Sequence, residues 1–275
     1  TFNNLEYLKI CLNSIKKNSK LTHEIILHVN DGSDGTLKFV KHNKFKFSHS
    51  TNNLGLCTAI NIAAKLSTTD YIVYAHDDMY FCPGWEDSLI KEINFIKHEN
   101  FYLSGTMIEP NSGHIKLDCG SDYKNFNEKK LLAEFNNNTF FDHQGSHFAP
   151  HLVTKKIWNK VGGFSEEFNP GIGSDPDFNM KLWKQNIRIF KGINNFRVYH
   201  FSSITTRKKK KVVQNKGDIT FLKKWGISSK FFKKHYLHSM TEFTGPLDDP
   251  KKNFSFFSGL LFCKIKLIYL KLLNK

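Results

Sequence analysis

The chain has 275 residues, of which 40% are hydrophobic and 14% aromatic. This composition excludes a disordered chain and permits one large domain or two fused halves around a shared core. Lys and Arg number 40 against 25 Asp and Glu, so the formal net charge is +15. Such a surface should attract anions, unless the excess of Lys reflects only a compositional bias.

The cysteines indicate the redox setting. There are 5 of them, scattered and without a C-x-x-C pair, which excludes the usual zinc and disulfide frameworks. We therefore expect a reducing, cytoplasmic setting. The longest apolar stretch, 254–273, is interrupted by Lys264, Lys266 and Lys271 and is not expected to span a bilayer.

The first 110 residues alternate between two kinds of pattern. Apolar residues at helical spacing predict helices over 5–17, 56–66 and 84–98. Short apolar runs predict strands over 24–29, 71–75 and 101–108. This alternation predicts an α/β fold, with a mostly parallel sheet flanked by helices.

Carboxylates follow two of these predicted strands. Asp31 comes after the first strand, and the adjacent pair Asp77 and Asp78 comes after the second. In such sheets the ligand crevice lies beyond the C-terminal strand ends, so we expect these carboxylates to face one crevice. Adjacent carboxylates repel, and a cation such as Mg²⁺ or Mn²⁺ would hold both ionised. The alternative is a solvated acidic turn.

The second half of the chain is less regular. Residues 111–150 lose periodicity and are expected to be loop-rich. A strand followed by a helix is predicted within 147–164, and a last helix over 216–226. The basic run 207–211 fits a solvated loop or a segment that captures phosphate or an anionic surface.

Three further positions are candidates for chemistry. In "SDPDF", Pro176 suits the first turn of a helix with Asp175 as its N-cap. One carboxylate of this segment could instead act as a general base. His200 is either structural or, beside a carboxylate site, a nitrogen ligand for a metal. Gly55 could let the backbone approach a phosphate.

Eight segments stand in a characteristic order. They are "TFNN", "EIILHVNDGSDGT", "NNLGLCTAINIAAK", "YIVYAHDDMYFCPGW", "VGGFSEEF", "GSDPDF", "VYHFSS" and "FLKKWG". From residue 1 to about 226, the chain resembles the family-two glycosyltransferases, which are inverting enzymes with the GT-A fold. Members of that family open with a strand and a P-x-[YF]-N turn. Since this chain begins inside that turn, we expect it to be N-terminally truncated, without the first core strand.

The resemblance implies roles for individual residues. It assigns nucleotide-sugar contacts to Phe2, Asn3, Asp31, Asn53, Gly55 and Asp77. It assigns the metal to Asp78 and His200 and the catalytic base to Asp175. Asp177 is expected either to hold the helix start or to contact the acceptor, and Trp85 to contact the acceptor. Three positions depart from the family pattern, namely Asn30, His76 and Ser174.

The predicted function follows from this resemblance. The chain is expected to move a sugar from a nucleoside-diphosphate sugar to a hydroxyl of a glycan or lipid-linked acceptor, with inversion and with Mn²⁺ or Mg²⁺. Residues 1–110 would bind the donor, 111–235 would bind the acceptor and carry the base, and 236–275 would form a tail. The alternatives are a nucleotide-sugar-binding pseudoenzyme and a basic nucleic-acid-binding protein. No nucleic-acid partner is expected, because no recognised nucleic-acid module occurs.

The tail combines aromatic, aliphatic and lysine residues. This mixture over 251–275 suits peripheral contact with an anionic membrane. For a cytoplasmic protein, this would be the inner face of the membrane. The alternative is a helix that packs on the domain.

Overall fold

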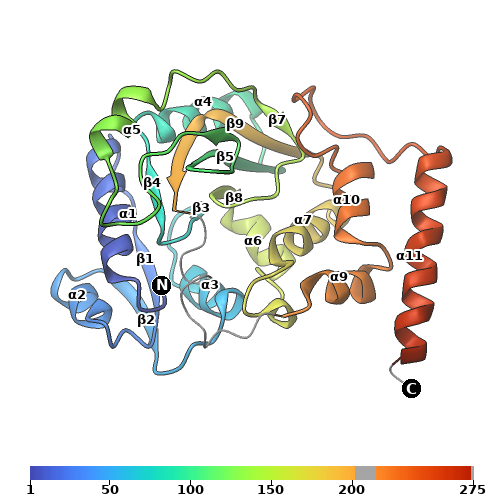
Figure 1. The fold of residues 1–275 in the computed structure, drawn as a ribbon, viewed down its shortest axis with the longest axis horizontal. Helices are drawn as coiled ribbons and strands as arrows, with labels where there is room; N and C mark the ends of the chain where they lie inside the picture. Colours follow the sequence, from blue (N-terminus) through green and yellow to red (C-terminus); the bar gives the residue numbers. More distant parts are fainter. Residues whose placement is uncertain (202–214, 274–275) are drawn as a thin grey trace.

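The computed structural model describes residues 1–201 and 215–273 (Figure 1). The basic run 207–211 lies outside the described residues. The elements of the first half are α1 (Leu5–Asn18), β1 (Ile26–Asn30), α2 (Thr36–His42), β2 (Lys46–Ser50), α3 (Leu56–Lys65), β3 (Tyr71–Tyr74), β4 (Met79–Phe81), α4 (Trp85–Ile96) and β5 (Phe101–Glu109).

Short elements occupy the next stretch and longer ones follow. They are β6 (Ile115–Lys116), α5 (Glu128–Glu134), β7 (His143–Gln144), β8 (His151–Thr154), α6 (Lys155–Val161), the 3₁₀ turn Glu166–Phe168, α7 (Ser174–Lys184), β9 (Ile189–His200), α9 (Gly217–Trp225), α10 (Ser229–His235) and α11 (Phe254–Leu273). Only β6, α5 and β7 interrupt the loops of 111–150, as the loss of periodicity predicts.

The strands form two sheets. β1 and β2 pair in parallel, and the larger sheet has the order β3-β8-β5-β9-β4, with β6 added to β5 and β7 to β9. β5 pairs in parallel with β9 and β6, whereas β3·β8, β5·β8, β4·β9 and β7·β9 are antiparallel. The α/β class is confirmed, but the larger sheet is mixed rather than mostly parallel. An apolar run identifies a strand and not its direction, so the pattern could not reveal that β8 enters between β3 and β5 in the opposite sense.

The elements that the sequence did not reveal are short or polar. β2 alternates weakly and carries Lys and Ser, and it is mostly half-buried at the edge of its sheet. β4 has only 3 residues. By contrast, β5 and β9 are buried along nearly all their length at the centre of the larger sheet, where a continuous apolar strand is expected.

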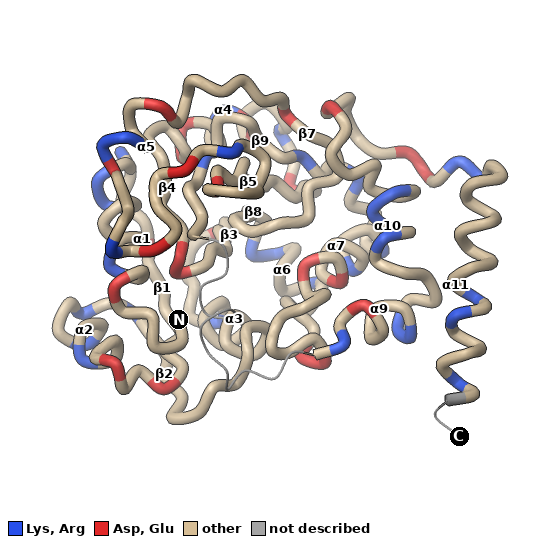
Figure 2. Tube along the Cα trace, viewed as in Figure 1, with Lys and Arg blue, Asp and Glu red and all other residues tan. Residues whose placement is uncertain are grey.

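Charge is spread over the described part of the molecule. Figure 2 shows Lys and Arg on the outer helices, including α1, α2, α5, α9, α10 and α11, rather than gathered on one of them. None of the helices in the described residues is long and apolar enough to cross a membrane.

Candidate active site

Two adjacent asparagines hold the ends of β1 and β3 together. Asn3 Nδ2 donates to Asp31 Oδ2 at 2.8 Å, and Asn4 Nδ2 donates to Asp77 Oδ1 at 3.3 Å. The start of α1 therefore links the loop after β1 to the loop after β3. The structure brings the carboxylates that follow the two strands into one region, as their positions at strand ends predict.

The loop after β1 has an unusual backbone that its neighbours fix. Asp31 and Asn3 adopt φ values of 62° and 48°, which are uncommon for residues other than glycine. Asn3 Oδ1 accepts a hydrogen bond from the Gly32 N–H at 2.8 Å, and Phe2 forms a parallel bridge with Asn30. A strained residue that its surroundings hold in place is typical of ligand-binding loops.

Asn30 has a structural task. Its side chain is buried, and Oδ1 accepts hydrogen bonds from the Leu54 N–H at 3.0 Å and from Ser50 Oγ at 2.9 Å. An amide oxygen thus fixes the loop that leads into α3. In that loop, Asn53 Oδ1 accepts a hydrogen bond from the Gly55 N–H at 3.0 Å.

Gly55 is the residue before α3 and has a φ of 82°. A Cβ at this position would lie 2.5 Å from Asn169 Oδ1, which itself accepts a hydrogen bond from the Cys57 N–H at 2.9 Å. The close approach of Asn169 is one reason for a glycine here, beside the phosphate contact predicted from the sequence.

A buried carboxylate lies between two histidines beyond β3. Asp78 Oδ1 is 3.4 Å from His200 Nε2 and 3.9 Å from His76 Nδ1. One ligand atom from each of these three residues lies within 4.8 Å of the others. The sequence pointed to Asp78 and His200 together, but counted His76 only as a departure from a family pattern.

A second carboxylate orients His200 from behind. Glu109 Oε1 lies 2.6 Å from His200 Nδ1, which leaves Nε2 directed at Asp78. Burial alone would lower the pKa of His200, but Asp78 and Glu109 outweigh it and raise this pKa to about 9. Glu109 was missed from the sequence, although an acidic residue at the end of a buried strand is a signal that could have found it.

The three side chains fit a divalent transition metal better than Mg²⁺. Two imidazoles and one carboxylate are ligands that Mn²⁺ accepts, whereas Mg²⁺ prefers oxygen alone. The carboxylate–histidine pair of Glu109 and His200 is the arrangement that commonly supports a metal-bound histidine. Metal binding would replace the proton on His200, since a ligating imidazole is neutral.

Asp175 occupies the second position of α7. The N-cap is Gly173, with a φ of 87°, so the N-cap role predicted for Asp175 is wrong, whereas Pro176 does fall in the first turn. Asp175 is half-buried as a residue, yet its Oδ1 is buried without a hydrogen-bond partner in the described residues. Burial raises the pKa of Asp175 to about 7 and outweighs the helix dipole, which alone would lower it.

Tyr74 connects Asp175 to the histidine–carboxylate group. Its hydroxyl lies 2.7 Å from His76 Nε2. Burial raises the pKa of Tyr74 well above its ordinary value, and the nearby charges of Asp175 and Asp78 raise it further. Both carboxylates therefore lie close enough to the Tyr74 hydroxyl to act on it electrostatically.

Asp177 lies in the interior and is fully engaged. Oδ1 accepts a hydrogen bond from Trp225 Nε1 at 2.7 Å and pairs with Lys224 Nζ at 2.9 Å, while Oδ2 accepts from Ser165 Oγ at 2.6 Å. The side chain is 0% exposed. These contacts join α7 to α9, so of the two expected roles the structural one fits Asp177 and the contact with the acceptor does not.

Trp85 is also part of the core. It is 4% exposed, its ring lies 4.8 Å from that of Phe81, and Nε1 donates to Ser19 Oγ at 3.2 Å. An indole at the start of α4 is buried for its large apolar area. The predicted contact of Trp85 with an acceptor is therefore corrected.

Comparisons with known proteins identify the fold. The model of the family described as glycosyl transferase family 2 matches residues 1–158. The structure of S. aureus TarS 1–349 is similar with a TM-score of 0.54 and 18% identity, covering 74% of this chain and 59% of that chain. The structure of GalNAc-T7 with UDP, GalNAc and Mn²⁺ gives a TM-score of 0.52 at 14% identity, covering 75% of this chain and 41% of that one.

These likenesses confirm the predicted GT-A fold. TarS 1–349 in complex with UDP-GlcNAc gives a TM-score of 0.53 at 18% identity, over 74% of this chain and 59% of that chain. The chain thus spans about three-fifths of the length of the TarS structures that it matches. No curated protein matches it.

Proposed function

Because the chain belongs to glycosyl transferase family 2, we propose that it transfers a sugar from a nucleoside-diphosphate sugar to an acceptor hydroxyl, with inversion at the anomeric carbon. The observation that carries this proposal is the convergence of carboxylates at the ends of β1 and β3. Asp31 and Asp77 are linked there through Asn3 and Asn4, and Asp78 lies beyond them between two histidines.

The donor would bind across the loops after β1 and β3. Phe2, Asn3 and Asp31 form the nucleoside side, where the rigid turn after β1 presents polar atoms to a base and ribose. Asn53 and Gly55 lie before α3, whose N-terminus favours anionic phosphates. UDP sugars are the first donors to test, because the related folds of TarS and GalNAc-T7 were solved with UDP-GlcNAc or with UDP and GalNAc.

His76, Asp78 and His200 would hold a divalent cation, and the two imidazoles favour Mn²⁺ over Mg²⁺, which prefers oxygen ligands. When bound, the cation supplies positive charge that neutralises the departing diphosphate. Glu109 keeps His200 in the tautomer that directs Nε2 toward Asp78, and Tyr74 holds Nε2 of His76. The departing diphosphate would then need no protonated acid from the chain to stabilise its negative charge.

Asp175 would act on the acceptor side. An attacking hydroxyl must lose its proton as it bonds to the anomeric carbon, and Oδ1 of Asp175 can accept it. This oxygen is buried and has no hydrogen-bond partner among the described residues, so its capacity to accept a hydrogen bond is unused within the chain. A carboxylate with a pKa of about 7 is a stronger base than an ordinary aspartate and is still ionised in part at neutral pH.

The rate of transfer should therefore depend on pH through Asp175. Because its pKa is raised to about 7, kcat/KM should rise about tenfold per pH unit below pH 7 and level off above it. Asp175→Asn should abolish this limb in the residual activity. A rate profile that is flat between pH 5 and 8, or unchanged in Asp175→Asn, would contradict the assignment.

Release of UDP from a UDP sugar with Mn²⁺ tests whether the chain turns over its donor. We expect release that depends on both Mn²⁺ and Asp175. Binding of the donor without any release, even with glycan or lipid-linked acceptors present, would instead indicate a nucleotide-sugar-binding pseudoenzyme. The halves 1–110 and 111–235 would then differ in function, with only the donor half active.

For the tail we propose peripheral contact with an anionic membrane, on the basis of the two faces of α11. One stripe packs toward α9 and α10, with Phe256 and Cys263 only 7% and 2% exposed. The remaining surface exposes a set of large apolar side chains, namely Phe254, Phe257, Leu261, Phe262, Ile265, Ile268, Tyr269 and Leu272. Lys264, Lys266 and Lys271 lie among them, as in helices that bind anionic membrane surfaces.

Flotation with phosphatidylglycerol vesicles tests this contact. Replacing Phe262, Ile265 and Tyr269 with Ser should abolish flotation, because it removes exposed apolar area and leaves the packed stripe intact. Phe95→Ser on α4 is the matched control, since Phe95 is 78% exposed and lies outside the tail. Equal flotation of the triple variant and the unmodified chain would refute the membrane contact.

A further inference from the structure

A polar pocket of about 440 Å³ lies between the start of α4, the loop after α5 and the middle of β9. Among the described residues that line it, one side chain is charged, that of Arg197 on β9. Most of the others are small and polar, and they include four asparagines, namely Asn136, Asn138, Asn194 and Asn195. The volume is in the range of sites for small molecules.

Arg197 carries a buried charge that no acidic side chain balances. The residue is 3% exposed, and within residues 1–201 and 215–273 its guanidinium pairs with no carboxylate. It donates instead to neutral oxygens, with Nε bonded to the Asn194 carbonyl at 3.1 Å, Nη2 to Asn194 Oδ1 at 2.7 Å, and Nη1 to the Phe135 carbonyl. An arginine is rarely buried to this degree unless an opposite charge pairs with it.

The groups around Arg197 do not supply the missing charge. Phe135 is the C-cap of α5, and the end of a helix contributes only roughly half a negative charge. Burial raises the pKa of the nearby Cys82 thiol, which is therefore neutral. Burial also lowers the pKa of Arg197, but a guanidinium stays protonated in proteins. The floor of the pocket is therefore positively charged.

The guanidinium also has unused donors. It has about five N–H groups, and the hydrogen bonds to Asn194 and Phe135 take one each from Nε, Nη1 and Nη2. One N–H on Nη1 and one on Nη2 therefore have no partner in the described part of the chain. Arginine uses pairs of N–H groups to bind two oxygens of a phosphate or a carboxylate.

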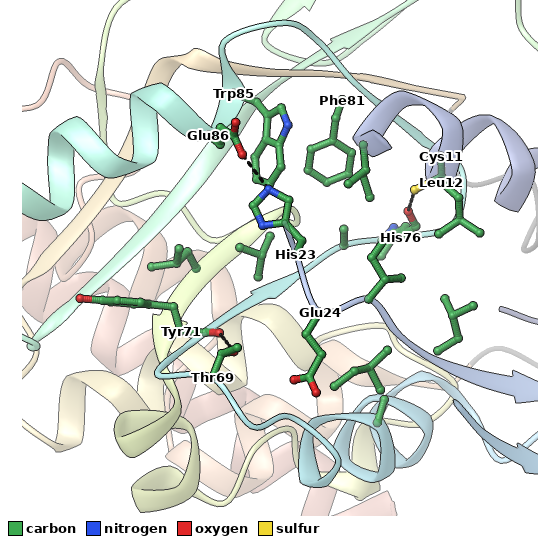
Figure 3. Close-up of a pocket in the computed structure, with 18 of the residues that line it drawn as sticks. Cys11, Leu12, His23, Glu24, Thr69, Tyr71, His76, Phe81, Trp85 and Glu86 are labelled. Atoms are coloured by element: carbon green, nitrogen blue, oxygen red, sulfur yellow. Dashed lines mark hydrogen bonds and ion pairs between the residues drawn. The ribbon is translucent and has the colours of Figure 1, made fainter. Parts of the chain in front are cut away.

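The start of α4 adds a weaker preference for anions. Its N-cap, Gly84, lines the pocket, and the N–H groups of a first helical turn have no partner within their helix. The acidic residues of this turn do not line the pocket. Figure 3 shows Glu86 in another, apolar pocket, where its Oε2 lies 2.7 Å from His23 Nε2. Asp87 pairs with Lys20 at the surface.

This pocket is separate from the candidate active site. Arg197 precedes His200 by three residues on β9, and side chains alternate between the two faces of a strand. Arg197 therefore lies on the face of β9 opposite to that of His200. None of the residues proposed to bind the donor or the metal lines the pocket.

We propose that this pocket binds an anionic sugar, with the charged group at Arg197 and the hydroxyls at the asparagines. The charged group would accept hydrogen bonds from the unused N–H groups of Nη1 and Nη2 and balance the buried guanidinium. A carboxamide offers both donors and an acceptor, as a sugar hydroxyl does, so the four asparagines suit a ligand with several hydroxyls. Phosphate and carboxylate groups present oxygens to a guanidinium in the same way, so either can be the charged group.

Calorimetry with three monosaccharides tests the proposal on the whole chain. Glucose 6-phosphate, glucuronate and glucose are titrated at constant ionic strength in EDTA, which prevents binding through a metal. We expect saturable binding of at least one of the two anionic sugars, at least about tenfold tighter than that of glucose, because hydrogen bonds to charged groups are the stronger ones. The tighter of the two anionic sugars identifies the charged group.

Two variants place this binding in the pocket. Arg197→Met removes the charge and the donors and should abolish binding. Asn195→Asp adds a negative charge at an exposed lining position and should weaken binding at least about tenfold by repulsion. Asn100→Asp changes the net charge equally, at an exposed position outside the pocket, and should leave the affinity unchanged.

Four results would overturn the proposal. They are no binding of either anionic sugar, equally tight binding of glucose, unchanged affinity in a folded Arg197→Met, and equal weakening by Asn195→Asp and Asn100→Asp. The last result would indicate general attraction to a basic surface. Displacement of the sugar by UDP would place it in the donor site and would equally contradict the proposal. None of these substitutions touches the donor or metal residues, so the outcome is independent of the proposed transferase activity.

Discussion

Asp175→Asn should reduce sugar transfer by roughly 10²–10⁴-fold, the usual effect of losing a general base. The amide keeps the shape of the carboxylate but cannot accept the proton of the acceptor hydroxyl. Affinity for the donor should stay near that of the unmodified chain, because Asp175 lies on α7, outside the loops after β1 and β3. Steady-state transfer rates and calorimetric donor binding, measured on the same preparation, separate these two effects.

The stability of Asp175→Asn at pH 8, measured beside its transfer rate, distinguishes the loss of a base from damage to the fold. Burial raises the pKa of Asp175 from 3.8 to about 7, so the proton it holds in the folded chain stabilises the fold at low pH. That contribution is lost as pH rises through 7. Asp175→Asn should therefore be more stable than the unmodified chain at pH 8. Lower stability at pH 8, or normal transfer, would show that the base is misassigned.

Asp177→Asn is the matched control on the same helix. It removes a charge that pairs with Lys224 Nζ at 2.9 Å in the interior. The substitution leaves Lys224 with Glu167, at 2.7 Å, as its remaining acidic partner and weakens the buried hydrogen bonds from Trp225 and Ser165, so Tm should fall. The rate of sugar transfer should fall far less than it does in Asp175→Asn. If Asp177→Asn folds and loses more transfer activity than Asp175→Asn, Asp177 is the base and Asp175 is not.

Asp78→Ala should abolish the part of donor binding that depends on Mn²⁺. Asp78 lies between His76 and His200 and supplies the only carboxylate of that group. Removing Asp78 should weaken Mn²⁺-dependent binding by more than the roughly 10–100-fold that is typical when a residue behind a metal ligand is replaced. Glu109→Gln provides that comparison, since Glu109 contacts His200 and not the proposed ion. Calorimetry of UDP binding, with Mn²⁺ and with EDTA, measures both variants.

The control for this prediction is Asp87→Asn. Asp87 pairs at the surface with Lys20, at 2.6 Å, and its side chain is 50% exposed. Its substitution should leave Mn²⁺-dependent binding unchanged. If Asp78→Ala binds UDP with unchanged affinity in Mn²⁺, or if the unmodified chain is fully active in EDTA, the histidine–carboxylate group does not hold a catalytic metal.

Strong local patterns made much of the fold predictable. α1, α4 and β5 were expected at 5–17, 84–98 and 101–108, and they lie at Leu5–Asn18, Trp85–Ile96 and Phe101–Glu109. Each is long or strongly periodic, because it buries one face or its whole surface in the core. The convergence of Asp31 with Asp77 was also predictable, since both follow strands of one α/β unit.

Other features depend on contacts between distant residues. The direction of β8 and the pairing of β4 with β9 are set by long-range packing and leave no local pattern. The pKa of Asp175 is governed by burial, which outweighs the local effect of the helix terminus. His76 becomes a metal-ligand candidate only because β9 places His200 beside Asp78, at 3.4 Å. The predicted acceptor contacts of Trp85 and Asp177 were wrong because the residues next to them in the sequence do not indicate that these side chains are buried.

A thermal-shift screen of nucleoside-diphosphate sugars tests the central claim most directly. A ligand that binds only the native state raises its stability, by about 2.7 kcal/mol at a hundred times Kd. We predict that at least one of these sugars, with UDP sugars first, raises Tm in Mn²⁺ and loses this effect in EDTA or in Asp78→Ala. If no nucleotide sugar shifts Tm while double-stranded DNA does so at physiological salt, the chain is a nucleic-acid-binding protein and the account is wrong.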